Sequence, residues 1–179
     1  MKVLVSAASK YGATSEIAEK IANTLREALS ERGGLNGDDV VVDVVSAEQV
    51  GSVEDYDAVV LGSAVYAGHW LESARELVER HAGALSERPT WLFSSGPIGE
   101  PPKPEEDPVD VAPIFEATKA RDHRVFAGKL DKSSLRFVER AIMVAVRAPD
   151  GDYRDWGEIR EWTEGIADTL AGEGQSGGS

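Results

Sequence analysis

Apolar and polar positions along the chain follow two periods, one typical of buried strands and one typical of amphipathic helices. Short apolar runs rich in β-branched residues predict five strands, at Lys2–Ser6, Val40–Val45, Ala58–Gly62, Thr90–Ser94 and Arg124–Gly128. Helical spacing predicts helices at Thr14–Arg32, Leu71–Leu85, Val111–Arg121, Ser134–Val146 and Asp155–Leu170, with a short helical turn within Ala47–Val53. Strands and helices therefore alternate along the whole chain.

This alternation predicts the fold class. Strands that are joined through helices run parallel, and a parallel sheet needs helices on both of its faces. We therefore expect an α/β fold, a doubly wound five-stranded parallel sheet with helices on both faces. Residues 1–170 are expected to form a single domain, because a chain of 179 residues suffices for one core. Residues 171–179, rich in Gly and Ser, are expected to be a disordered tail.

Three loops that follow the first, third and fourth predicted strands form the candidate site. In doubly wound sheets, ligands bind beyond the carboxyl ends of the strands, where the strand order reverses. These three loops are rich in Gly, Ser and aromatic residues. The candidate binding residues are Ser9, Lys10, Tyr11, Gly12, Ala13 and Thr14 in the first loop, Ala64, Val65, Tyr66, Ala67 and Gly68 in the second, and Ser94, Ser95, Gly96 and Pro97 in the third.

The first loop has the composition of a phosphate-binding turn. It joins a buried strand to a helix, so backbone N–H groups and the positive end of the helix dipole meet there. Hydroxyls of Ser9, Thr14 and Ser15 can donate to phosphate oxygens, and Gly12 lets the backbone approach closely. Neither the G-x-G-x-x-G nor the G-x-x-x-x-G-K-[ST] fingerprint is present. A plain turn with a helix N-cap is the alternative interpretation.

Aromatic residues mark the second loop. Tyr66 and Trp70 suit a planar ring system, or else they cap the hydrophobic core. Three roles are possible for His69, namely a contact with a ligand, a proton relay and a cap of the next helix. The three histidines, His69, His81 and His123, lie far apart on different predicted elements. We therefore expect no Ser–His–Asp set and no metal cluster, and we assign no side-chain acid or base.

Charge and composition narrow the class of partners. The net charge of −13 disfavours nucleic acid and favours basic docking partners. The stretch from Lys119 to Arg147 is a basic island, with a net charge of +5 against −18 over the remainder. The absence of cysteine excludes disulfides and thiol chemistry. Neither a signal peptide nor an apolar run near the roughly 20 residues that span a bilayer is visible, which predicts a cytoplasmic protein without a transmembrane segment.

The loops resemble those of flavodoxin-fold proteins that bind flavin mononucleotide (FMN). The stretch from Ser9 to Thr14 is similar to the family's phosphate loop, T-x-T-G-x-T, and keeps its glycine and its last threonine. Tyr11 replaces the middle hydroxyl residue, which removes one phosphate donor. The resemblance implies a flavodoxin-like sheet that binds FMN, with the phosphate on the first loop. It also implies that the second loop covers the flavin ring and the third lines its pyrimidine end.

Within that fold, the chain resembles the menaquinone-dependent protoporphyrinogen dehydrogenase family from about Lys2 to about Leu170. The matching features are Gly12–Ala18 (Gly-Ala-Thr-Ser-Glu-Ile-Ala), the Gly68-His69 pair, Phe126–Leu130, a basic apolar helix at Leu135–Val146, and Tyr153-x-x-Trp156 before the last helix. The resemblance implies an FMN-dependent dehydrogenase that oxidises a porphyrinogen-like substrate and passes the electrons to a quinone.

Two classes of function stay open at this point. The basic, apolar helix at Leu135–Val146 suits a weak membrane-surface contact or a porphyrin carboxylate, which favours the enzyme, although a core-packing helix has the same pattern. The acidic net charge favours an electron-transfer protein that docks basic redox partners and has no small-molecule substrate. The expected partners are accordingly a redox protein or a quinone, with a porphyrinogen as the candidate substrate.

Overall fold

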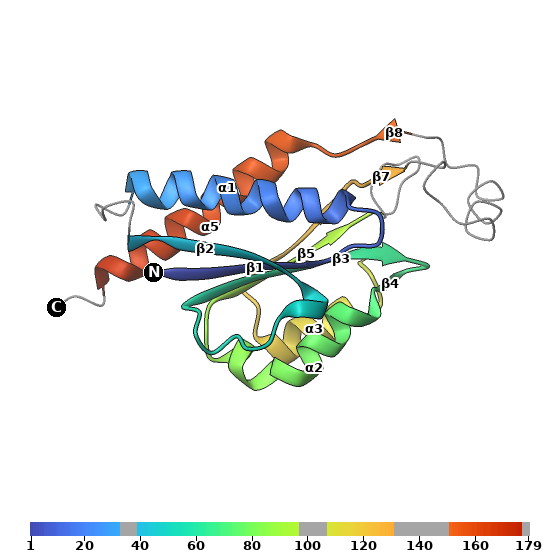
Figure 1. Ribbon diagram of the computed structural model, residues 1–179, viewed down its shortest axis with the longest axis horizontal. Helices are drawn as coiled ribbons and strands as arrows, with labels where there is room; N and C mark the ends of the chain where they lie inside the picture. The colour runs from blue at the N-terminus through green and yellow to red at the C-terminus, as the bar shows by residue number, and fades with distance from the viewer. Residues whose placement is uncertain (33–38, 97–106, 131–150, 177–179) are drawn as a thin grey trace.

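A central parallel sheet organises the chain (Figure 1). The computed structural model describes residues 1–32, 39–96, 107–130 and 151–176. The parallel strands are β1 (Lys2–Ala8), β2 (Val41–Ser46), β3 (Ala58–Tyr66), β5 (Thr90–Ser95) and β6 (His123–Phe126). They pair in the order β2-β1-β3-β5-β6, with every one of these pairings parallel. The predicted doubly wound α/β fold is confirmed.

Helices cover both faces of this sheet (Figure 1). Helices α1 (Ala13–Arg32) and α5 (Trp156–Ser176) pack side by side on one face. Helices α2 (Glu72–Ser86) and α3 (Val111–Thr118), with the 3-10 turn η2 (Ala47–Gln49), cover the other. None of the described helices combines the length and the apolar character needed to cross a membrane.

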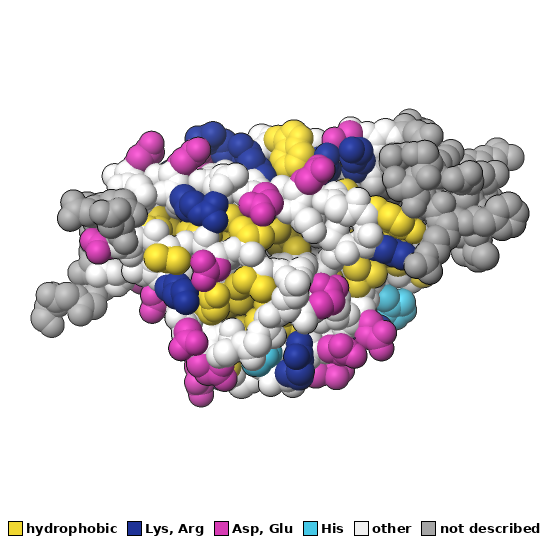
Figure 2. Space-filling view, in the orientation of Figure 1, with side chains coloured by type: hydrophobic (Ala, Val, Ile, Leu, Met, Phe, Trp, Pro, Cys, Tyr) yellow, Lys and Arg dark blue, Asp and Glu magenta, His cyan; other side chains and the backbone are white. Residues whose placement is uncertain are grey.

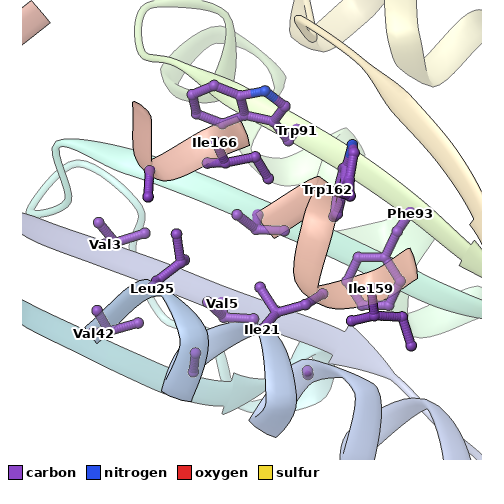
Figure 3. Close-up of a cluster of buried hydrophobic side chains, with 14 of the residues drawn as sticks. Val3, Val5, Ile21, Leu25, Val42, Trp91, Phe93, Ile159, Trp162 and Ile166 are labelled. Carbon is purple, nitrogen blue, oxygen red and sulfur yellow. The ribbon is translucent and has the colours of Figure 1, made fainter. Parts of the chain in front are cut away.

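Side-chain alternation along the strands divides the core of the described residues into two clusters. On β1, for example, Val3 and Val5 point towards α1 and α5, whereas Leu4 points towards α2. The cluster under α1 and α5 contains Phe93 and Trp162, which Figure 3 shows together with the aliphatic side chains of α1. Because both faces of the sheet are buried, the strands read as continuous apolar runs, and this made them predictable.

Two antiparallel pairings within the described residues depart from the prediction. Strand β3 continues past its predicted end at Gly62 and turns back through Ala67 and Gly68 into β4 (His69–Trp70). Both turn residues have positive φ, 50° and 78°, as a two-residue hairpin requires. Strands β7 (Lys129–Leu130) and β8 (Gly151–Asp152) form a second, separate ribbon.

Helix α5 is longer than predicted. It ends at Ser176 instead of Leu170, so residues 171–176 are helical rather than disordered. An ion pair of 2.6 Å between Arg121 Nη1 and Glu173 Oε1 attaches the last turns to the body of the protein, which the Gly and Ser content does not reveal. Residues 177–179, Pro97 and the predicted helix at Ser134–Val146 lie outside the described residues.

Candidate functional site

The three predicted loops meet at the carboxyl edge of the sheet. The strand register places Ala8 beside Ser63, and Ala64 beside Ser95, so the loops after β1, β3 and β5 begin next to one another. The chain moves from β1 to one side to form β2 and then to the other side to form β3. The loops therefore surround the point where the strand order reverses, which is the ligand position in sheets of this kind.

Each of the three loops turns at a glycine with positive φ. The φ values are 91° at Gly12, 78° at Gly68 and 88° at Gly96. A Cβ atom at Gly12 or Gly68 would meet nothing within 4 Å, so these two positions need the conformational freedom of glycine rather than its small size.

The first loop is held by its own hydrogen bonds. Gly12 N donates to Ser9 Oγ at 3.1 Å, and Glu16 N donates to the Gly12 carbonyl at 3.0 Å, which opens α1. Ala13 is the first residue of α1, and Thr14 is buried, with 2% exposure. Because Ser9 Oγ accepts the Gly12 bond, its own proton stays available for a ligand. The amino end of a 20-residue helix thus lies at the predicted phosphate position.

A lysine and two tyrosines connect the first loop to the second. Lys10 Nζ lies 5.3 Å from the centroid of the Tyr66 ring and 5.6 Å from that of Tyr11, both within the range of cation–π attraction. Burial, with a smaller contribution from Tyr11, raises the pKa of Tyr66 to about 12. Tyr66 therefore keeps its proton at neutral pH, and the two rings lie near the mouth of the site.

The second loop is tied from behind by the segment that leads into α3. The Gly68 carbonyl accepts a hydrogen bond from Val109 N at 2.9 Å. Asp110 Oδ2 accepts one from Trp70 N at 2.9 Å and lies 3.1 Å from His69 Nδ1. His69 is thus held by Asp110 and does not cap α2, whose N-cap is Leu71.

The two aromatic residues of the second loop occupy different environments. Trp70 is 1% exposed and packs in the core under α2, so it belongs to the interior of the protein. Tyr66 is partly exposed at the end of β3, while its neighbours Ala64 and Val65 are buried and partly buried. Of the two aromatic candidates, Tyr66 is the one placed to face a ligand.

In the third loop, the side chains of the two serines are buried, so the backbone is the part that a ligand could contact. Ser94 is fully buried and Ser95 is 5% exposed. Gly96 N donates to the Phe126 carbonyl at 3.0 Å, which fixes the start of the loop against β6. Pro97 lies outside the described residues, so the rest of this loop stays a prediction.

Buried hydrogen bonds link Trp70, Ser94 and His123, which the sequence pattern did not predict. Ser94 Oγ accepts a bond from Trp70 Nε1 at 2.8 Å and lies 2.8 Å from His123 Nε2. His123 Nδ1 is 3.6 Å from Asp107 Oδ1. Ser94, His123 and Asp107 therefore lie near one another, although the histidine and the serine are 29 residues apart in sequence. The Ser94 hydroxyl is nevertheless inaccessible to a substrate, so these bonds brace β5 against β6.

Burial of His123 predicts a pH dependence of stability. Desolvation lowers its pKa below the ordinary 6.5, against opposing effects of Asp107 and Asp122. The unfolded chain binds a proton near pH 6.5, so the free energy of unfolding falls as pH drops below 6.5 and levels off below the lowered folded pKa. In urea titrations between about pH 7.5 and about pH 5, we expect His123→Gln to show a shallower fall than the wild type.

A matched control for this titration is His69→Gln, which replaces a histidine side chain that is 51% exposed. Comparison of the two variants shows whether the change in the fall of stability belongs to position 123 or follows from replacing any histidine. Equal slopes for the wild type and His123→Gln would contradict the assignment of the titration to His123.

Comparison with known proteins agrees with the fold. Residues 4–156 match the family model described as Flavodoxin domain, and the chain belongs to this family. The protoporphyrinogen IX dehydrogenase (quinone) of Escherichia coli strain K12 is 25% identical over 180 residues, covering 93% of this chain and 95% of that protein.

Solved structures show the same fold. A flavodoxin from the domain Archaea superimposes with a TM-score of 0.61 at 18% identity, covering 95% of this chain and 99% of its own. The flavodoxin of Streptococcus pneumoniae TIGR4 superimposes with a TM-score of 0.60 at 19% identity, covering 97% of this chain and 99% of its own.

Proposed function

We propose that this protein binds FMN at the carboxyl edge of its sheet and acts as a flavin-dependent oxidoreductase. The observation that carries the proposal is the meeting of three loops, each turning at a positive-φ glycine, at the reversal of strand order. The first of these loops opens the long helix α1, which supplies the positive end of a helix dipole for a phosphate. Membership of the Flavodoxin domain family supports the same conclusion.

The residues of the site fit FMN in their chemistry. Ser9 and Thr14, with the amides of the first loop, are neutral donors suited to a phosphate dianion. Tyr11 and Tyr66 supply aromatic faces for a planar ring. The Gly68 carbonyl accepts a bond from Val109 N and keeps a second lone pair with which it can accept another donor. Bound FMN supplies the hydride and electron-transfer chemistry, and the protein positions it.

We infer further that the substrate is porphyrinogen-like and that the electron acceptor is a quinone. The support is the 25% identity to the Escherichia coli protoporphyrinogen IX dehydrogenase, which extends over nearly the full length of both chains. The competing function is that of an electron carrier for basic redox proteins. The net charge of −13 favours it, and Figure 2 shows acidic side chains spread over the visible face and gathered along its lower edge, over α2.

Two measurements on purified protein test these proposals in turn. Absorption spectra and titration with FMN come first, and a colourless protein that cannot be reconstituted with FMN would overturn the flavin site. Steady-state oxidation of protoporphyrinogen IX with a menaquinone analogue follows. Turnover by the flavin-loaded protein would support the dehydrogenase. A flavin-loaded protein without turnover would overturn the substrate proposal and favour the electron carrier.

The buried Thr14 gives a test of the phosphate position. We expect Thr14→Ala to weaken FMN binding by about 1–3 kcal/mol, because a hydrogen bond to a charged group is lost. Thr14→Ser keeps the hydroxyl and should keep most of the affinity, as measured by fluorescence titration.

Thr24 provides a matched control in the same helix. Like Thr14 it is 2% exposed, but its hydroxyl has no hydrogen-bond partner among the described residues. Thr24→Ala should leave the affinity for FMN unchanged. The same affinity for wild type and Thr14→Ala would place the phosphate elsewhere.

A further inference from the structure

A buried arginine joins the C-terminal part of the chain to the predicted phosphate loop. Arg154 follows β8, and Figure 1 shows the segment between β8 and α5 running over the amino-terminal part of α1. The Arg154 side chain is 4% exposed, and Nη1 donates to the carbonyl of Ala13 at 3.2 Å. Ala13 is the first residue of α1, so the guanidinium group contacts the first turn of the helix, next to the loop that would hold the phosphate.

Two carboxylates and an aromatic ring hold Arg154 in this position. Asp152 accepts a two-pronged pair of bonds, 2.8 Å from Nε to Oδ1 and 2.7 Å from Nη2 to Oδ2. Nη1 also donates to the carboxylate of Glu16. The guanidinium group stacks 4.6 Å from the ring centroid of Trp156. The bonds to Asp152 and Glu16 raise the pKa of Arg154, and the bonds from Arg154 lower the pKa of Asp152, so Arg154 and Asp152 are both charged at neutral pH.

The placement of Glu16 explains why an arginine matters here. Glu16 stands in the first turn of α1, where a carboxylate interacts with the helix dipole and competes with a bound anion for it. Its side chain is 58% exposed, so only its partner fixes its direction. Arg154 draws this carboxylate to the side of the helix where Asp152 lies, and it neutralises part of the combined negative charge.

We propose that Arg154 is a positioning residue for the phosphate group of FMN, acting by holding the Ala13 turn and by binding the Glu16 carboxylate. This inference rests on the proposed FMN site and assigns to Arg154 a role in affinity for the phosphate but not for the ring. Riboflavin has the same ring as FMN and no phosphate. The ratio of the two affinities therefore isolates the contribution that Arg154 makes.

The test is fluorescence titration of FMN and of riboflavin, at low salt, with the wild type, Arg154→Lys and Arg154→Met. We expect Arg154→Met to raise the Kd for FMN by about tenfold or more and to leave that for riboflavin within about twofold. Arg154→Lys keeps the charge and should recover part of the loss. Equal losses for both flavins, or no loss for FMN, would overturn the inference. A wild type that binds neither flavin would instead overturn the proposed FMN site.

A second arm replaces Glu16 and so remains decisive if Arg154→Met does not fold. Glu16→Gln should tighten FMN binding about threefold, because it removes a carboxylate from the first turn of α1 and leaves Arg154 in place. Glu19→Gln, one turn further along the helix, makes the same change in net charge and should have no comparable effect. In the double variant, Glu16→Gln should restore part of the affinity that Arg154→Met loses. Equal effects of Glu16→Gln and Glu19→Gln would overturn the inference.

Discussion

Replacing Gly62 by alanine is expected to destabilise the protein by about 3 kcal/mol, the upper part of the range for overpacking a core. A Cβ atom at this position would lie 2.2–2.4 Å from three ring atoms of Phe93, far inside van der Waals contact. The Phe93 ring is fully buried and is itself flanked by Phe126 and Trp162, with centroids 6.2 Å and 6.3 Å away. The Phe93 ring therefore cannot move away from the added Cβ atom without displacing these neighbouring rings.

Urea unfolding of Gly62→Ala measures this effect, and Gly83→Ala in α2 is its control. A Cβ atom at Gly83 would meet nothing within 4 Å, so we expect this variant to gain about 0.5–1 kcal/mol from helix propensity. The double variant Gly62→Ala with Phe93→Leu should lose less stability than the two single changes together, because the smaller side chain relieves the overlap. A loss below about 1 kcal/mol for Gly62→Ala would show that the Phe93 ring moves freely.

The same glycine shows where a sequence pattern misplaces a boundary. The prediction ends the third strand at Gly62. In the structure β3 continues to Tyr66, and Gly62 is present because the Phe93 ring lies over it. In the hairpin that follows, Val65 pairs with Trp70 and Tyr66 with His69 around the two-residue Ala67-Gly68 turn, which is not one of the dipeptides that mark hairpins most strongly in a sequence.

The three loops of the candidate site could be predicted from the sequence, but the long-range contacts that hold them could not. The three loops follow from strand order, because parallel strands end at one edge and ligands bind where that order reverses. Arg154 reaches Ala13 across 141 residues, and His123 reaches Ser94 across 29. No local pattern encodes such contacts, since they depend on how the elements pack. The roles of Arg154 and His123 in holding these loops could therefore not be predicted from the sequence.

Replacing Trp162 by alanine should have the largest effect on stability, a loss of about 3–5 kcal/mol. Trp162 extends from α5 into the core and is 7% exposed (Figure 3). Its ring meets Phe126 edge-on at 5.5 Å and Phe93 at 6.3 Å. Its Nε1 donates to Asp122 Oδ2 at 2.7 Å, which ties α5 to the residue before β6. Truncation leaves a cavity between these rings and removes a hydrogen bond as well.

Two companion variants separate the ring from the hydrogen bond in calorimetric or urea unfolding. Trp162→Phe keeps an aromatic ring between Phe93 and Phe126 but loses the Asp122 bond, so a loss of about 1–2 kcal/mol is expected. Trp156→Ala removes the same side chain from the first turn of α5, where it is 37% exposed, and should cost less than Trp162→Ala. If Trp162→Ala and Trp156→Ala destabilised the protein equally, the aromatic cluster around Trp162 would not be the main contact that holds α5 on the sheet. The helix that follows Arg154 would then lack the anchor that the Trp162 contacts give it, and Arg154 would be held only by its own contacts with Asp152, Glu16, Trp156 and the Ala13 carbonyl.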